Sequence, residues 1–231
     1  LSDQYRPLSH YFRQNFSQVT NPPIDSLREN KVMSLRTRFG NLGNILNFND
    51  LSKENIYVLD SPILSNSQFE KFKDYFKENY KIIECTFNKE DTLKVALDRI
   101  RSSAEIAARE GIKQIILTDK IIDENTLAIP MVLAVGAVNS HLIQKSLRGF
   151  ISLNVQTGDV LDTHSYATLL GVGATTINPY LALDTICQRF EKNLFGKFDI
   201  EDCIKRYIKS VNNGLLKIMS KMGISVLSSY R

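Results

Sequence analysis

From about Ile56 onward, the sequence alternates short runs rich in β-branched residues with longer amphipathic stretches, which is the pattern of βα units around a parallel sheet. The expected strands are residues 56–59, 81–87, 114–119, 150–155 and 174–178. A first helix is expected after the capping-box pattern of Ser65 and Gln68. Further helices are expected at residues 89–109, 131–147, 162–170, 181–192 and 200–219.

These strands are too few to close a regular eight-stranded (β/α) barrel. We therefore expect an α/β fold in which parallel βα units form a partial or deformed (β/α) barrel-like domain, or a barrel completed by chain beyond Arg231. The run at residues 223–227 predicts one more strand, which would begin a new unit.

Size and charge favour an ordinary globular protein of one large domain or two small ones. The chain has 231 residues, of which 43% are hydrophobic and 23% are charged. Its net charge of +4 is spread along the sequence, which gives little support for nucleic acid or membrane binding. The longest apolar run, residues 127–138, is too short to span a bilayer and contains Pro130.

The cysteines and histidines do not have the spacing of a metal site. The three cysteines are far apart and form no CxxC pair, which argues against zinc, an iron–sulfur cluster or a disulfide framework. We expect reduced core thiols in a reducing compartment. The histidines lack an HExxH or carboxylate spacing, so no metal is expected. The residues concerned are Cys85, Cys187, Cys203, His10, His141 and His164.

The stretch QVTNPPIDSLRE, residues 18–29, places two prolines at an expected helix start. Asn21 is a favoured N-cap, and Pro22 and Pro23 fit the first helical positions because the N–H groups there have no partner inside the helix. Such a terminus is stiff and poor in donors, so it is a weak candidate for an anion site. It is suited to holding Val19, Thr20 and Asn21 in a fixed place.

Several separate motifs, in order along the chain, resemble the central domain of the glutamate synthase large chain. They are QVTNPPIDSLRE followed by VMSL (residues 32–35), LDSPIL (59–64), LAVGAV (133–138), GVGATTINPYLALDTI (171–186) and GLLKIMSKMGIS (214–225). The resemblance covers nearly the whole sequence. It implies a central linking domain at residues 1–213 and the start of the FMN-binding synthase domain at 214–231.

The resemblance implies an intact enzyme that converts glutamine and 2-oxoglutarate into two glutamates. In the family, an amidotransferase domain with a leading cysteine releases ammonia, and a later barrel carries FMN and an iron–sulfur cluster. Electrons come from a pyridine-nucleotide-linked small subunit or from ferredoxin. This chain begins with Leu1 and has isolated cysteines, so we expect no cofactor in it and no catalysis by it alone. The implied location is the cytoplasm, or a plastid in a photosynthetic eukaryote.

In the family, the central domain joins the two active-site domains and helps to wall an internal ammonia passage. The stiff turn makes Thr20 and Asn21 candidate wall residues, and the alternative is that Asn21 is a cap and Thr20 a turn residue. Ser220 and Lys221, just before the expected last strand, are weak candidates for facing the flavin. Packing at a domain border is the alternative for this pair.

A second function remains open, namely an independent barrel-type enzyme that binds a phosphorylated ligand. Its basis is the glycine-rich turn Gly171–Ala174 before an expected strand, which resembles phosphate-binding turns of barrel enzymes. A connection between a helix and a strand also needs glycines simply to turn. Thr118 and Asp119 end an apolar strand, where barrel chemistry usually lies, although a lone Asp there is more often a cap.

Overall fold

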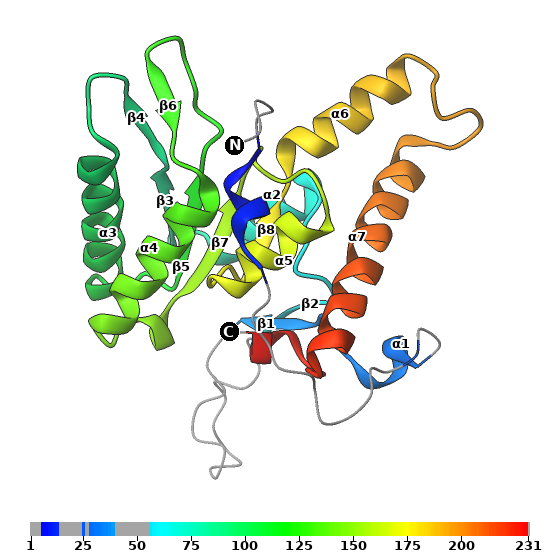
Figure 1. The fold of residues 1–231 in the computed structure, drawn as a ribbon, viewed down its shortest axis with the longest axis horizontal. Helices are drawn as coiled ribbons and strands as arrows, with labels where there is room; N and C mark the ends of the chain where they lie inside the picture. The colour runs from blue at the N-terminus through cyan, green and yellow to red at the C-terminus, as the bar shows by residue number, and fades with distance from the viewer. Residues whose placement is uncertain (1–5, 14–24, 26–27, 40–55, 231) are drawn as a thin grey trace.

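The computed structural model describes residues 6–13, 25, 28–39 and 56–230, and its centre is a parallel four-stranded sheet (Figure 1). The strand order is β3-β5-β7-β8, so each βα unit adds its strand beside the preceding one. The strands are β3 (Tyr80–Glu84), β5 (Gln114–Thr118), β7 (Ser152–Gln156) and β8 (Thr176–Asn178). β5 is buried along its whole length, as expected for a central parallel strand.

The first βα unit joins this sheet at its far edge. Ile63 forms a parallel bridge with Ile177 of β8, supported by hydrogen bonds from Leu64 N to Ile177 O (2.9 Å) and from Ile177 N to Pro62 O (2.8 Å). The first unit therefore lies beside the last strand. The first and last units are neighbours in a barrel, but not in an open doubly wound sheet. Within the described residues no pairing links Ile63 to β3, so the barrel is not closed.

One face of the sheet packs against four helices and forms the main hydrophobic core. Ile115, Leu117, Leu153, Val155 and Ile177 point toward this side and are fully buried. The helices are α3 (Leu93–Arg109), α4 (Met131–Gln144), α5 (Thr163–Gly171) and α7 (Ile200–Met222). α4 is apolar on nearly all sides, consistent with burial between the sheet and α3.

The other face carries a smaller aromatic cluster. Ile116 of β5 packs here with Leu64 and with Phe69 and Phe72 of α2 (Asn66–Phe76). Phe39 of β1 (Thr37–Phe39) and Leu59 of β2 (Tyr57–Leu59) complete it, and β1 and β2 pair antiparallel. The predicted capping box is confirmed, since Ser65 Oγ accepts from Gln68 N (3.2 Å) and Gln68 Oε1 accepts from Ser65 N (3.0 Å).

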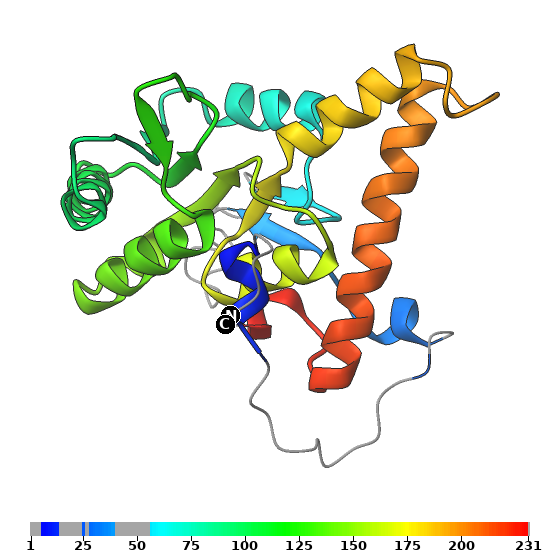
Figure 2. The same ribbon diagram turned by 45° about the horizontal axis from the view of Figure 1, so that its top comes forward.

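The remaining elements lie around these layers. β4 (Thr86–Asn88) pairs antiparallel with β6 (Thr126–Ala128), and α6 (Tyr180–Glu191) packs against α7. Figures 1 and 2 both show α6 and α7 extending from the body of the protein on the side opposite α3. The short helical turns are η1 (Leu8–Tyr11), α1 (Glu29–Val32), η3 (Arg148–Phe150) and η4 (Leu227–Tyr230). None of the described helices has the length and apolarity needed to cross a membrane.

The predicted α/β class with parallel βα units in an incomplete barrel is confirmed, whereas three of the strand predictions need correction. The strand expected at 56–59 is β2, which pairs with β1 outside the parallel sheet. The strand expected at 81–87 divides at Cys85 into β3 and β4, because the chain leaves the sheet to pair with β6. The strand expected at 223–227 is wrong: in the part of the chain that the structure describes, this segment forms a single bridge, from Val226 to Ser34, before η4 begins.

Candidate functional site at the carboxyl edge of the sheet

Polar side chains gather where β5, β7 and β8 end. Asp119 follows β5, Gln156 ends β7 and Thr157 follows it, and Tyr180 lies two residues after Asn178 of β8. Because parallel strands end at the same edge, these residues come together although they are far apart in the sequence. This is the edge at which βα proteins usually place their chemistry.

Asp119 is the centre of the site and is only 4% exposed. Its carboxylate accepts hydrogen bonds from Thr157 Oγ1 and from the backbone N–H of Gly158 (3.0 Å to Oδ1), and Tyr180 donates its phenolic O–H. The ammonium group of Lys120 lies 5.8 Å from the centroid of the Tyr180 ring. One carboxylate therefore ties the loop after β5 to the loops after β7 and β8.

Burial controls the proton equilibria of this cluster. Burial raises the pKa of Asp119 above its ordinary value, although the hydrogen bonds from Thr157, Gly158 and Tyr180 oppose that shift. Burial, together with the negative charge of Asp119, raises the pKa of Tyr180 to about 12. Tyr180 therefore stays a neutral donor at neutral pH, as its bond to Asp119 requires.

A second row of polar side chains crosses the strand ends beside Asp119. Thr118 Oγ1 donates to Gln156 Oε1 (3.1 Å), and Gln156 Nε2 donates to Asn178 Oδ1 (3.2 Å). Asn178, which is fully buried, donates to Leu64 O (3.1 Å) and to Asn66 Oδ1 (2.9 Å). The row links β5, β7 and β8 to the start of α2, so it holds the first βα unit against the last strand.

The geometry of the site is that of a scaffold. The oxygens of Asp119 accept hydrogen bonds from groups in the loops after β7 and β8. Every buried side-chain polar atom of the described residues has a hydrogen-bond partner. Asp159 in the same loop accepts from Met131 N (3.3 Å) at the start of α4. These bonds fix the loop positions, and they favour the cap interpretation of Asp119 over a role as an acid or base.

Thr157, Gln156, Asn178 and Tyr180 were not singled out by the sequence analysis. The signal was available, because each lies within two residues of the end of an expected strand, as Thr118 and Asp119 do. What the sequence lacks is the pairing order that brings the three strand ends together.

Of the residues proposed for the ammonia passage and the flavin, the structure describes only the flavin pair. Thr20 and Asn21 lie outside the described residues. Ser220 is buried in the last turn of α7 and Lys221 beside it is exposed. Figure 1 shows this end of α7 at the bottom of the view, whereas β4 and β6 lie at the top. A contact of Ser220 or Lys221 with a flavin stays a prediction.

The glycine-rich turn Gly171–Ala174 is a helix terminus at the amino edge of the sheet. The N–H groups of Val172, Gly173 and Ala174 donate to carbonyls of α5, at 3.0, 3.2 and 3.0 Å. Gly173 has φ +124°, and a Cβ there would lie 2.5 Å from Cγ of Asn139. These glycines serve the backbone turn, and the turn has no N–H group left for a phosphate. The observation on which the alternative enzyme function rested is thereby removed.

The thiols and histidines are dispersed in the described chain. Burial raises the pKa of Cys85 to about 12, so this side chain is a thiol and does not fit a metal or cluster ligand. Cys187 and Cys203 are partly exposed on α6 and α7. Among the residues that the structure describes, no three His, Cys, Asp or Glu side chains come close enough to hold a metal ion.

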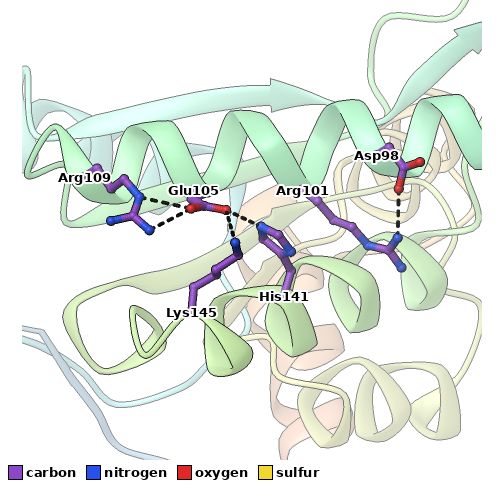
Figure 3. A network of polar contacts seen from close by, with 6 residues as sticks. All are labelled: Asp98, Arg101, Glu105, Arg109, His141 and Lys145. Carbon is purple, nitrogen blue, oxygen red and sulfur yellow. Dashed lines mark hydrogen bonds and ion pairs between the residues drawn. The ribbon is translucent and has the colours of Figure 1, made fainter.

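A cluster of charged side chains lies between α3 and α4 (Figure 3). Glu105 contacts Arg109 Nη2 at 2.8 Å, His141 Nε2 at 2.7 Å and Lys145 Nζ at 3.7 Å. The Glu105 side chain is 19% exposed, and hydrogen bonds from Arg109 and His141 lower its pKa. The i,i+4 spacing of Glu105 and Arg109 is readable in the sequence, but the partners across the helix pair are not.

Glu105→Gln is expected to lower stability at neutral pH, and the deficit should shrink in acid. A carboxylate whose pKa is lowered by folding stabilises the folded protein at pH values above the pKa it has in the unfolded chain. This stabilisation is lost as the pH falls through the pKa of the folded state. Urea unfolding of both proteins between about pH 7 and pH 3 measures the difference. Asp98→Asn on the same helix, which removes an ion pair with a 56% exposed carboxylate, is the control and should have little effect. A deficit independent of pH would contradict the prediction.

Comparison with known proteins gives a family for the chain. The family model described as glutamate synthase central domain matches residues 1–231. The glutamate synthase [NADPH] large chain of Azospirillum brasilense is 53% identical over 234 residues, and the chloroplastic ferredoxin-dependent glutamate synthase of Spinacia oleracea is 40% identical over 246. Each alignment covers 100% of this chain and 15% of the relative, so the chain spans a small part of their length.

Among solved structures, a mutant flavocytochrome b2 with benzoylformate aligns with a TM-score of 0.47 and 14% identity. The alignment covers 71% of this chain and 36% of that one. This likeness is too weak to support an argument about function.

Proposed function

Because the chain belongs to the glutamate synthase central domain family, we propose that it is the linking domain of a glutamate synthase large chain. The intact polypeptide would convert glutamine and 2-oxoglutarate into two glutamates. The observation that carries this proposal is the match of the family model to the whole chain, together with relatives of which this chain is only 15%. The rest of such a polypeptide has room for both reaction centres.

The proposed role is to connect the amidotransferase domain to the FMN synthase domain. Residues 1–213 would form the linking domain, and residues 214–231 would begin the FMN domain. α7 runs without interruption from Ile200 to Met222, so one helix would cross this border. The Asp119 network supports the role, since a connector that holds two domains in a fixed relation needs loops of fixed geometry.

The reaction and its cofactors belong, in this proposal, to the other domains. FMN and the iron–sulfur cluster would lie in the synthase domain, and glutamine hydrolysis in the amidotransferase domain. Electrons would come from a small subunit or from ferredoxin. One relative is named for NADPH and another for ferredoxin, and both align with the whole of this chain. The domain would thus serve a step common to both kinds of enzyme. Its location would be the cytoplasm, or a plastid as named for the spinach relative.

We also propose that Thr20 and Asn21 contribute to the wall of the ammonia passage. Ammonia must move between the two centres without being protonated in bulk water, so its passage needs a dry and rigid wall. The sequence Asn21-Pro22-Pro23 restricts the backbone at this point, because proline fixes its own φ and limits the residue before it.

Replacing Thr20 by Trp in the intact enzyme is expected to uncouple the two half-reactions. A bulky side chain in the wall should obstruct ammonia, so glutamine would still be hydrolysed while glutamate formation falls several-fold. The measurement is the amount of glutamate formed per glutamine hydrolysed. Thr20→Ser, which keeps the hydroxyl and adds no volume, is the control and should stay coupled.

A second substitution separates the channel interpretation from the cap interpretation. Asp caps a helix as well as Asn, so Asn21→Asp should be harmless if Asn21 only caps. A new carboxylate in an ammonia passage should instead lower the coupling ratio. Full coupling in both Thr20→Trp and Asn21→Asp would rule out the wall assignment. The coding sequence on either side tests the wider proposal: it should encode an upstream domain with a leading cysteine and a downstream barrel with clustered cysteines.

A further inference from the structure

Large apolar side chains lie exposed in the loops at the carboxyl edge of the sheet. Ile121 and Ile122 lie in the loop after β5, Leu161 lies in the loop after β7, and Leu181 lies at the start of α6. These four side chains are between 52% and 69% exposed. A single exposed apolar residue is common, but connecting loops are mostly polar, so four in neighbouring loops indicate a surface that a partner covers.

The Asp119 network brings the four side chains into one region. The loops after β5, β7 and β8 meet where Asp119 accepts from Gly158 N (3.0 Å) and from the hydroxyl of Tyr180. Ile121 is two residues from Asp119, so their Cα atoms are at most about 8 Å apart. Leu181 packs on the neighbouring loop, because a Cβ at Gly158 would lie 3.2 Å from Leu181 Cδ2. The carboxyl-edge surface is defined here as Ile121, Ile122, Leu161 and Leu181.

Buried hydrogen bonds give the carboxyl-edge surface a fixed shape. Asp119 and Thr157 are both buried, and their hydrogen bond joins the loop after β5 to the loop after β7. Loops held in this way lose little conformational freedom when a partner binds, which favours docking. Removing large apolar side chains from water favours association as well. The surface therefore has the two properties expected of a protein–protein contact, apolar area and a fixed shape.

The N-terminal segment of the domain reaches the same edge. η1 packs against the start of α5, the helix that follows the loop after β7. His164 Nε2 donates to Ser9 O (2.9 Å), and His10 Nε2 lies 3.7 Å from Asp162 Oδ2. Arg6 is three residues before Ser9, so their Cα atoms are at most about 11 Å apart. Any chain that precedes Arg6 therefore joins the domain beside the loop that carries one member of the surface.

We propose that the carboxyl-edge surface is the face on which the upstream amidotransferase domain of the same polypeptide docks, an inference that rests on the linking role proposed above. The upstream domain is attached through the chain before Arg6, so it is held beside this surface at a high effective concentration. The downstream domain is attached at the other end, since Figure 1 shows η1 in the upper half of the molecule and the last turn of α7 at the bottom. A second copy of the chain has no such attachment.

The first test is the reactivity of introduced cysteines in the intact polypeptide. Ile122→Cys and Leu181→Cys should each react with a neutral maleimide at least about tenfold more slowly than N-acetylcysteine, because access requires local opening of the interface. Val95→Cys on α3 replaces a side chain that is 58% exposed, away from this edge, and should react almost as fast as the free thiol. Peptide mass spectrometry separates these thiols from the native ones. Reaction of both surface cysteines at the free-thiol rate would overturn the proposal.

The second test identifies the occupant. Ile122 is replaced in the intact polypeptide by the photo-crosslinking residue p-benzoylphenylalanine, and Leu161 is replaced in a second variant in case the first does not fold. We expect cross-links within one polypeptide to peptides that precede residue 1. Cross-links only to the downstream domain or to a separate subunit would refute the assignment. A product of doubled mass would instead identify a second copy, and the absence of upstream cross-links in both variants would equally refute it.

These results are separable from the test of the linking role. The flanking coding sequence decides whether an amidotransferase domain lies upstream, whatever the introduced thiols do. An upstream amidotransferase domain together with freely reacting surface cysteines would overturn the docking face and leave the linking role intact. An upstream domain of another kind that cross-links to position 122 would support the docking face and remove the linking role.

Discussion

Asp119→Leu is expected to lower the free energy of unfolding by about 3 kcal/mol, because a buried acceptor shared by three donors disappears. Leucine has the branched shape of aspartate, with two methyl groups in place of the carboxylate oxygens, and it cannot accept a hydrogen bond. The hydroxyls of Thr157 and Tyr180 and the N–H of Gly158 would then lose their partner. Urea unfolding measures the loss, and an unchanged slope against denaturant would show that the native fold persists.

Asp119→Asn is the matched control, because it keeps one acceptor oxygen of the same shape. Its loss should be clearly smaller than that of Asp119→Leu, and equal losses would contradict the network assignment. The two proteins also differ in their pH dependence. Since burial raises the pKa of Asp119, the folded state binds its proton more tightly, so this residue's contribution to stability falls as the pH rises through the folded pKa. That decline should be absent in Asp119→Asn.

The two buried or half-buried carboxylates therefore act in opposite directions in acid. Glu105 gains partners that favour its charged form, so its contribution to the stability of the folded state is lost as the pH falls. Asp119 is more deeply buried, and its contribution rises as the pH falls. Acid unfolding of the unmodified protein should report the sum of such contributions, and the single substitutions Glu105→Gln and Asp119→Asn should separate them.

Local features of the sequence were sufficient to predict the fold class and the helices that follow Ile56. The capping box at Ser65 and Gln68 lies where expected, and α3 and α7 lie close to their expected ranges, because caps and a 3.6-residue apolar repeat are local signals. β5 was also predicted, because a short, fully apolar run between two helices is typical of a buried parallel strand.

Long-range pairing could not be predicted from the same signals. The pairs β1–β2 and β4–β6 and the bridge from Ile63 to Ile177 join segments whose local patterns do not specify a partner. The Asp119 site illustrates the consequence. Its central residue could be noted as a polar residue ending a strand, but its partners Thr157 and Tyr180 lie in two other loops. Their meeting depends on the strand order.

Leu215→Ala is expected to lower the free energy of unfolding by about 2–5 kcal/mol, the range for a fully buried leucine in a packed core. Leu215 lies in α7 just after the proposed domain border, and it belongs to the main core together with Leu216, Met219 and Leu227. The preceding residue explains how closely α7 approaches α5: a Cβ at Gly214 would lie 2.6 Å from Cγ2 of Thr163. Thermal or urea unfolding measures the loss.

Leu194→Ala is the matched control, since Leu194 lies between α6 and α7 and is 64% exposed. The same side-chain truncation there should change stability by no more than about 0.5 kcal/mol. If Leu215→Ala were as mild as Leu194→Ala, the residues after 213 would not be part of this core, and α7 could not transmit a fixed orientation across the border. A large difference means that the two proposed domains share one core through α7. A linking domain that is to hold two reaction centres at a constant separation requires that kind of junction, because a flexible linker would let the distance between them vary.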